Sequence, residues 1–110
     1  MAKSPRMQQI EAMLVDEPDD AFLRYGLAME HASSGDDASA SEVLLDLIAR
    51  GGSSPYIPAF LMCGQALVRL GREDKAVEVL KTGIAAARAA NTPESLHALG
   101  ELQGLLATIE

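Results

Sequence analysis

The side chains that could take part in covalent or metal chemistry are few in this sequence. Cys63 is the only cysteine, and His31 and His97 are the only histidines. Cys63 lies beside Gly64 on an apolar helical face, where a cysteine behaves as a small buried hydrophobic residue. The two histidines lie far apart in the sequence and lack the spacing of a metal-ligand cluster. We therefore expect neither a nucleophile nor a metal site.

Two short segments share composition with ligand-binding loops but lack their essential residues. The acidic run Asp16, Glu17, Asp19 and Asp20 has neither the glycine nor the distal glutamate of a calcium loop. The segment 51–54 is glycine-rich, but it is too short for a phosphate-binding loop and precedes no lysine. An enzyme needs convergent polar groups, and none is found. We expect no catalytic residues, no cofactor and no enzymatic activity.

The charge balance argues against nucleic acid and anionic membranes as partners. Nine Lys and Arg residues stand against 16 Asp and Glu residues, which gives a formal net charge of −7. Binding to phosphates requires clustered basic residues, and here they are scattered. No apolar run approaches the roughly 18 residues of a membrane span. With a single cysteine and no secretory signal pattern, we expect a soluble, cytoplasmic protein.

Helix start and stop signals divide the chain into six segments. Caps, first-turn prolines and acidic residues precede each apolar stripe, and glycine or proline follows it. No stretch alternates apolar and polar residues as a half-buried strand would. The pattern predicts six helices in antiparallel hairpins, over about residues 5–17, 20–34, 36–50, 57–70, 73–90 and 93–109.

An internal repeat organises these helices. Ala28, Gly64 and Gly100 lie 36 residues apart. Their neighbours follow the same step, since Ala40 matches Ala76 across the second helix of each hairpin. A spacing shared by both helices of a hairpin is a repeat signature. Small residues at these positions allow close helix approach, so we expect all three to lie at equivalent helix crossings.

The second unit resembles a tetratricopeptide repeat. It reads Phe60-x2-Cys63-Gly64-x2-Leu67 and then continues through Ala76 to Leu80. The family pattern is W-x2-L-G-x2-Y followed by A-x3-F in a repeat of about 34 residues. The resemblance, to small stand-alone bacterial members in particular, implies an all-α fold. Its antiparallel hairpins would stack as a short right-handed α-solenoid.

The resemblance also implies a division of the single domain. Residues 1–18 would form an N-terminal helix, 19–54 the first repeat, 55–91 the second, and 92–110 a C-terminal capping helix.

The register of the first repeat stays open. Ala28 as the small residue needs no insertion, but it puts Arg24 and His31 where large apolar residues belong. The rival register, with Gly26 as the small residue, fits the first helix better and misplaces Gly35 by two residues. We prefer Ala28.

The resemblance to tetratricopeptide repeats implies a concave groove lined by the first helix of each hairpin. Placed residue by residue, the groove would contain Phe22, Tyr25, Met29, Leu61, Gln65, Val68, Arg69, His97 and Glu101. Arg69 could orient a partner carboxylate through a bidentate contact. The alternative is that Phe22, Leu61 and Val68 simply pack on neighbouring helices and that Arg69 is solvated.

The groove suggests a non-catalytic module that binds a peptide or a partner helix of another protein. Some family members clamp the carboxylate of chaperone C-terminal peptides with Lys and Asn. The matching positions here include Tyr25, Met62 and Glu94, so we expect no such binding. The alternative function is a self-assembling homo-oligomeric unit, in which the apolar residues of the first helix cover one end of the array or bind another copy. These residues are Met7, Ile10, Met13 and Leu14.

Overall fold

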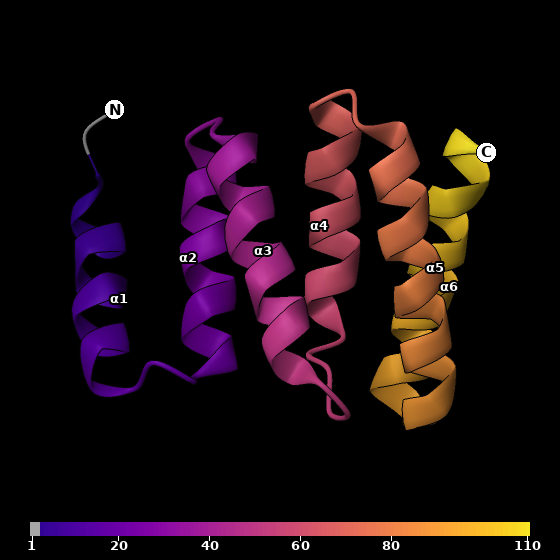
Figure 1. The fold of residues 1–110 in the computed structure, drawn as a ribbon, viewed down its shortest axis with the longest axis horizontal. Helices are drawn as coiled ribbons and strands as arrows, with labels where there is room; N and C mark the ends of the chain where they lie inside the picture. The colour runs from indigo at the N-terminus through magenta and orange to yellow at the C-terminus, as the bar shows by residue number, and fades with distance from the viewer. Residues whose placement is uncertain (1–2) are drawn as a thin grey trace.

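The computed structural model describes residues 3–110, which form six α-helices and no strand within that range. The helices follow one another across the molecule, with α1 at one end and α6 at the other (Figure 1). Their bounds are α1 Pro5–Asp16, α2 Ala21–Ser33, α3 Asp37–Gly51, α4 Pro58–Arg69, α5 Glu73–Ala90 and α6 Pro93–Ile109. The predicted all-α class and the number of helices are confirmed, and α5 is continuous to Ala90.

Four of the helices begin with a side-chain cap at a residue type that the sequence had marked. The side chains of Ser4, Asp20, Asp36 and Thr92 each accept a hydrogen bond from a backbone N–H of the first turn. Such caps satisfy a donor that the helix leaves unpaired. The helix starts are therefore determined by local sequence.

The helix ends depend on two glycines in a backbone conformation that other residues rarely adopt. Gly35 and Gly71 follow α2 and α4 with φ angles of 81° and 77°. Each lets the chain reverse within three residues and begin the next antiparallel helix. Asn91, with φ 51°, serves in the same way between α5 and α6.

Successive helices pack against each other, and α4 lies at the centre of the core. It contacts α3, α5 and α6, while α1 packs mainly on α2. Phe60, Cys63 and Leu67 of α4 are at most 2% exposed. Together with Ala59 of the same helix, they share one buried cluster with residues of α2, α3, α5 and α6, namely Ala28, Leu44, Leu47, Ala76, Val79, Leu80, Ile84, Ala87 and Leu102.

Glycine allows α4 and α5 to approach closely at two places. A Cβ atom at Gly64 would lie 2.7 Å from Leu80 Cδ2, closer than such atoms pack in proteins. A Cβ atom at Gly83 would lie 2.6 Å from Phe60 Cβ. The predicted close approach at Gly64 is confirmed, and Gly83 adds one that the repeat pattern did not indicate.

The expectation for Gly100 was wrong. Gly100 is exposed, and a Cβ atom there would meet nothing within 4 Å. The 36-residue step persists into α6, but no seventh helix follows α6 within the described chain to pack on it. The small residue at 100 is therefore not at a helix crossing equivalent to the one at 64.

The two candidates for the small residue of the first repeat face different helices. Ala28 is fully buried in the main core cluster with Leu44. Gly26 instead faces α1, since a Cβ atom there would lie 3.6 Å from Ile10 Cδ1. Ala28 thus occupies the environment that Gly64 has in the next hairpin.

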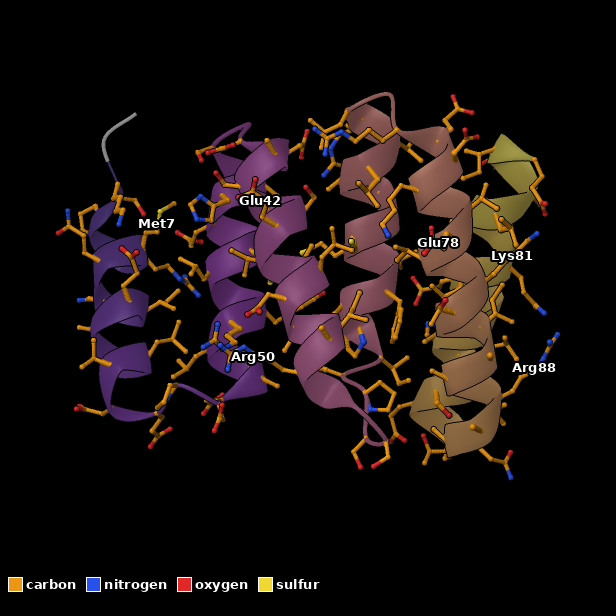
Figure 2. The ribbon with its side chains drawn as sticks, viewed as in Figure 1. Met7, Glu42, Arg50, Glu78, Lys81 and Arg88 are labelled. Carbon is orange, nitrogen blue, oxygen red and sulfur yellow. The ribbon has the colours of Figure 1, made fainter. Side chains whose placement is uncertain are left out.

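Arg24, which the Ala28 register places at an apolar position, is accommodated by polar partners. Its Nε donates to the carbonyl oxygen of Pro18 at 2.7 Å, and its Nη1 lies 3.2 Å from Asp46 Oδ2. Arg50, labelled on α3 in Figure 2, shares that carboxylate and also reaches Asp19 at 3.1 Å. The network joins the start of α2 to the end of α3.

Candidate functional site

Three predicted groove residues on α2 lie together around one cavity. Phe22, Tyr25 and Met29 follow one another at helical spacing and therefore share a face. That face meets α1 in a cavity of about 650 Å³ at the N-terminal end of the array. The residues that line the cavity are Arg6, Gln9, Ile10, Met13, Phe22, Leu23, Tyr25, Gly26 and Met29.

The cavity gathers most of the large apolar side chains that the fold leaves exposed. Phe22 is 72% exposed, Met13 51% and Met29 44%. Single exposed apolar residues are ordinary, but a contiguous patch marks an interaction surface. α1 supplies one wall through Ile10 and Met13, which the sequence reading assigned to end covering or self-assembly. We call this site the α1–α2 pocket.

Tyr25 extends the site toward the rest of the array. Its ring and that of Tyr56, in the segment before α4, have centroids 5.4 Å apart and a tilt of 57°. Burial raises the pKa of Tyr25, with smaller contributions from Tyr56 and from the negative charge of Glu101 on α6. α2, the start of α4 and α6 therefore converge near Tyr25.

Leu61 and Val68 of α4 are half-buried and pack against the core cluster. Between them Gln65 is exposed. The side chains of Leu61 and Val68 therefore take part in core packing, and their exposure to a partner in a groove stays a prediction.

Arg69 does not extend freely into a groove. Its Nε and Nη2 donate to both carboxylate oxygens of Asp37, at 2.9–3.0 Å, and this pairing raises the pKa of Arg69. The bidentate geometry is therefore used within the chain, with the carboxylate of Asp37 at the start of α3 as its acceptor. A contact of Arg69 with a partner carboxylate stays a prediction, and the α1–α2 pocket does not include Arg69.

The two predicted residues of α6 are exposed and adjacent. His97 Nε2 lies 3.6 Å from Glu101 Oε1, with side chains 82% and 51% exposed. Glu101 also lies close enough to Tyr25 for its charge to act on that hydroxyl. Glu101 therefore joins the Tyr25 region, and His97 is its neighbour one turn away on α6.

The cysteine lies in the core and one of the histidines lies beside a turn, both away from the α1–α2 pocket lining. Cys63 is fully buried, and desolvation raises the pKa of its thiol to about 11. A thiol in that state is a poor nucleophile. His31 lies 3.9 Å from Asp36 at the turn between α2 and α3.

Within residues 3–110, no three His, Cys, Asp or Glu side chains come together in a way that could hold a metal ion. No helix of that range has the length and apolar character needed to cross a membrane.

A second cavity of similar volume, away from α1, has a different character. It measures about 670 Å³ and lies between the end of α3 and α5. Its walls include the small residues Ala85, Ala86 and Ala89 and the loop 52–55. No large exposed apolar side chain lines it, so there is less apolar area for a partner to cover.

Sequence reasoning missed α1 and Tyr56 as parts of the site. The helical spacing of Met7, Ile10 and Met13 showed that α1 has an apolar face. It could not show that Met7 and Ile10 are buried and that Met13 stays exposed beside Phe22. Tyr56 lies in a loop by composition, and no periodicity relates it to Tyr25.

Comparison with known proteins supports the fold. No protein-family model matches the sequence, and no match is found among curated proteins. A search of solved structures finds the crystal structure of a tetratricopeptide repeat domain protein from Salinibacter ruber, with a TM-score of 0.71 and 29% sequence identity. The alignment covers 82% of this chain and 94% of that one.

Proposed function

We propose, from its tetratricopeptide-repeat-like fold, that this chain is a non-catalytic module that holds an apolar segment of another protein in the α1–α2 pocket. The observation that carries the proposal is the clustering of Phe22, Met13 and Met29, exposed by 72%, 51% and 44%, around one cavity. Tetratricopeptide repeat proteins generally act by binding proteins or peptides, which agrees with this use of the surface.

The size of the pocket suits one or two side chains of a partner. Ligand cavities range over about 300–1,000 Å³, and this one measures about 650 Å³. Burying one Leu- or Phe-sized side chain contributes about 1.5–3 kcal/mol. A partner helix or extended segment with two such anchors would therefore gain most of its affinity here.

The polar residues that line the pocket could orient a bound partner, but they do not form the arrangement that catalysis needs. Arg6 and Gln9 stand at its edge, and Arg6 Nε lies 3.8 Å from Glu30. Catalysis would need a nucleophile or base with an orienting partner. Cys63 is buried in the core, and His97 lies on α6 outside the pocket lining.

The test removes apolar surface from the pocket without disturbing the core. We expect the double substitution Phe22→Ser and Met29→Ser to reduce partner capture from an extract of the source organism at least tenfold, because it deletes the two largest exposed anchors on α2. Quantitative mass spectrometry of the captured proteins measures the effect. Substituting Leu61 and Val68 would be a poorer test, since both pack on the core.

Val15→Ser is the matched control. Val15 is 80% exposed on α1 but does not line the pocket, so the variant loses exposed apolar area elsewhere. Capture should be unchanged, and all variants should keep the helical circular dichroism signal. If the double variant captures the same proteins as the unchanged chain, the α1–α2 pocket is not the binding site.

Self-association is the second candidate function. Met7 and Ile10 of α1 are buried, and α1 packs on α2. Met13 and Val15 of α1 remain 51% and 80% exposed. A second copy could cover this area. Light scattering over a wide concentration range tests it, and a constant monomer mass would eliminate this candidate.

A further inference from the structure

The Tyr25–Tyr56 pair presents two aromatic rings at the edge of the α1–α2 pocket. Tyr25 lines the pocket itself, and Tyr56 lines a neighbouring hollow of about 250 Å³ together with Glu94. Within the described chain, neither hydroxyl makes a hydrogen bond. The ring faces carry negative potential, so such a pair attracts cations.

Carboxylates lie near both tyrosines. Burial is the largest cause of the raised pKa of both tyrosines. The negative charge of Glu101 adds to the effect on Tyr25, and that of Asp20 adds to the effect on Tyr56. Glu94 lines the hollow next to Tyr56. The pair therefore lies among three negative groups that come from α6 and from the start of α2.

The arginines nearest these rings are each paired with a carboxylate. Arg6 lines the α1–α2 pocket and lies 3.8 Å from Glu30. Arg24 and Arg50 line a hollow of about 240 Å³ with Tyr56 and pair with Asp46 and Asp19.

α2, α4 and α6 contain only two Lys or Arg residues, Arg24 and Arg69. Arg24 pairs with Asp46 and Arg69 pairs with Asp37, and both carboxylates belong to α3. In residues 3–110, no Lys or Arg nitrogen lies within 4 Å of a side-chain oxygen of Glu101, Glu94 or Asp20. The surface built from these three helices thus keeps an excess of negative charge.

We infer that the partner segment carries a Lys or Arg next to its apolar anchors, and that this cation lies over the Tyr25 and Tyr56 rings beside Glu101. The inference rests on the proposed function, because the apolar anchors occupy the α1–α2 pocket. It names the chemistry of the partner as a basic, apolar peptide segment. An acidic segment would meet Glu101, Glu94 and Asp20 and be repelled.

The expected selectivity is modest and measurable. Both tyrosine rings are partly exposed. A cation over such rings gains about 0.5–1 kcal/mol, and an exposed ion pair adds about 0.2–1 kcal/mol. Since about 1.4 kcal/mol corresponds to a tenfold change in affinity, a Lys should bind roughly threefold to 30-fold more tightly than a neutral residue of the same length.

Three capped heptapeptides test the inference. They are identical except for the central residue, which is Lys, norleucine or Glu, and leucines flank that residue on both sides. Each is titrated into the ¹⁵N-labelled full chain, and amide shifts report both affinity and location. We expect the Lys peptide to shift the amides of Tyr25, Tyr56 and Glu101, the norleucine peptide to bind more weakly, and the Glu peptide to bind weakest.

Two charge-matched variants separate the local effect from overall charge. Glu101→Gln should remove about half or more of the preference for Lys over norleucine. Glu42→Gln makes the same chemical change at an exposed position on α3, labelled in Figure 2, and should leave the preference unchanged. Tyr56→Leu should lower the affinity for the Lys peptide about threefold, through loss of one ring.

The outcomes distinguish this inference from the proposed function. Equal binding of the Lys and norleucine peptides in the α1–α2 pocket overturns the basic-partner inference and leaves the apolar docking function standing. A preference for Lys that Glu42→Gln weakens as much as Glu101→Gln does also overturns it, since the effect would then be general attraction to a net charge of −7. If none of the peptides shifts pocket amides, both proposals fail.

Discussion

Gly83 packs directly against the side chain of Phe60. A Cβ atom added at Gly83 would lie 2.6 Å from Phe60 Cβ and 2.8 Å from Phe60 Cγ, closer than such atoms pack in proteins. Both positions are buried, so neither helix can move away without losing packing. Gly64 has a similar relation to Leu80, where a Cβ atom would approach a more flexible side-chain end. Gly83 is therefore the stricter of the two requirements.

Gly83→Ala should destabilise the protein by about 1–3 kcal/mol, because overpacking against a rigid ring outweighs the better helix propensity of alanine. Gly100→Ala is the matched control, with nothing within 4 Å of the new Cβ atom. It should stabilise α6 by about 0.5–1 kcal/mol. Urea unfolding followed by circular dichroism measures both. Equal free energies of unfolding for the two variants would contradict the packing argument.

Cys63 should resist thiol reagents in the folded protein. The thiolate is the reacting form, and burial raises the pKa of Cys63 from 9.0 to about 11. A raised pKa means fewer thiolates at any lower pH, so at pH 8 ionisation alone slows the reaction about 100-fold, and burial slows it further. Labelling with a disulfide reagent, with and without denaturing urea, checks this. Fast labelling of the folded chain would show that α4 opens readily.

At the scale of helices, local caps and long-range pairs have different effects. The cap of α6 is reciprocal: Thr92 Oγ1 accepts from the Ser95 N–H at 3.1 Å, and Ser95 Oγ accepts from the Thr92 N–H at 2.8 Å. The Arg69–Asp37 pair instead joins the end of α4 to the start of α3. The cap determines where a helix begins, whereas the pair fixes how two helices meet.

Thr92→Ala should lower the free energy of unfolding by about 1 kcal/mol, since it leaves a helix-terminal N–H without its acceptor. The partly buried position of this bond prevents full compensation by water. Ser53→Ala, in the exposed loop before α4, is the control and should change stability little. Thermal unfolding compares the two, and an unchanged midpoint for Thr92→Ala would refute a role for the cap.

The whole molecule is an array whose ends are less supported than its middle. α1 packs mainly on α2, whereas α4 packs on three helices. Lys81 and Arg88 extend from α5 at the end opposite α1 (Figure 2), where they line a hollow of about 540 Å³ with α6. In repeat arrays each unit is stabilised by its interfaces with its neighbours, and a terminal helix has fewer of them, so we expect terminal helices to open first.

Native-state hydrogen exchange should therefore rank the helices by their position in the array. The amides of α4 and α5 should exchange only through global unfolding, while those of α1 exchange through local opening that costs less free energy. Because α1 forms one wall of the α1–α2 pocket, a bound peptide should slow its exchange. Equal protection of α1 and α4 without peptide would show that the array unfolds as one unit.

Local sequence patterns were enough to predict six helices, the caps at Ser4, Asp20, Asp36 and Thr92, and a 36-residue repeat. These depend on residues a few positions apart, so their signals are written along the chain. Which apolar face remains exposed to solvent can be read only from the packed helices. In the structure Ile10 is buried and Phe22 is exposed. Arg69 pairs with Asp37, and the rings of Tyr56 and Tyr25 lie together. A helical stripe looks the same in sequence whether a neighbouring helix covers it or not, because cover depends on contacts between distant segments.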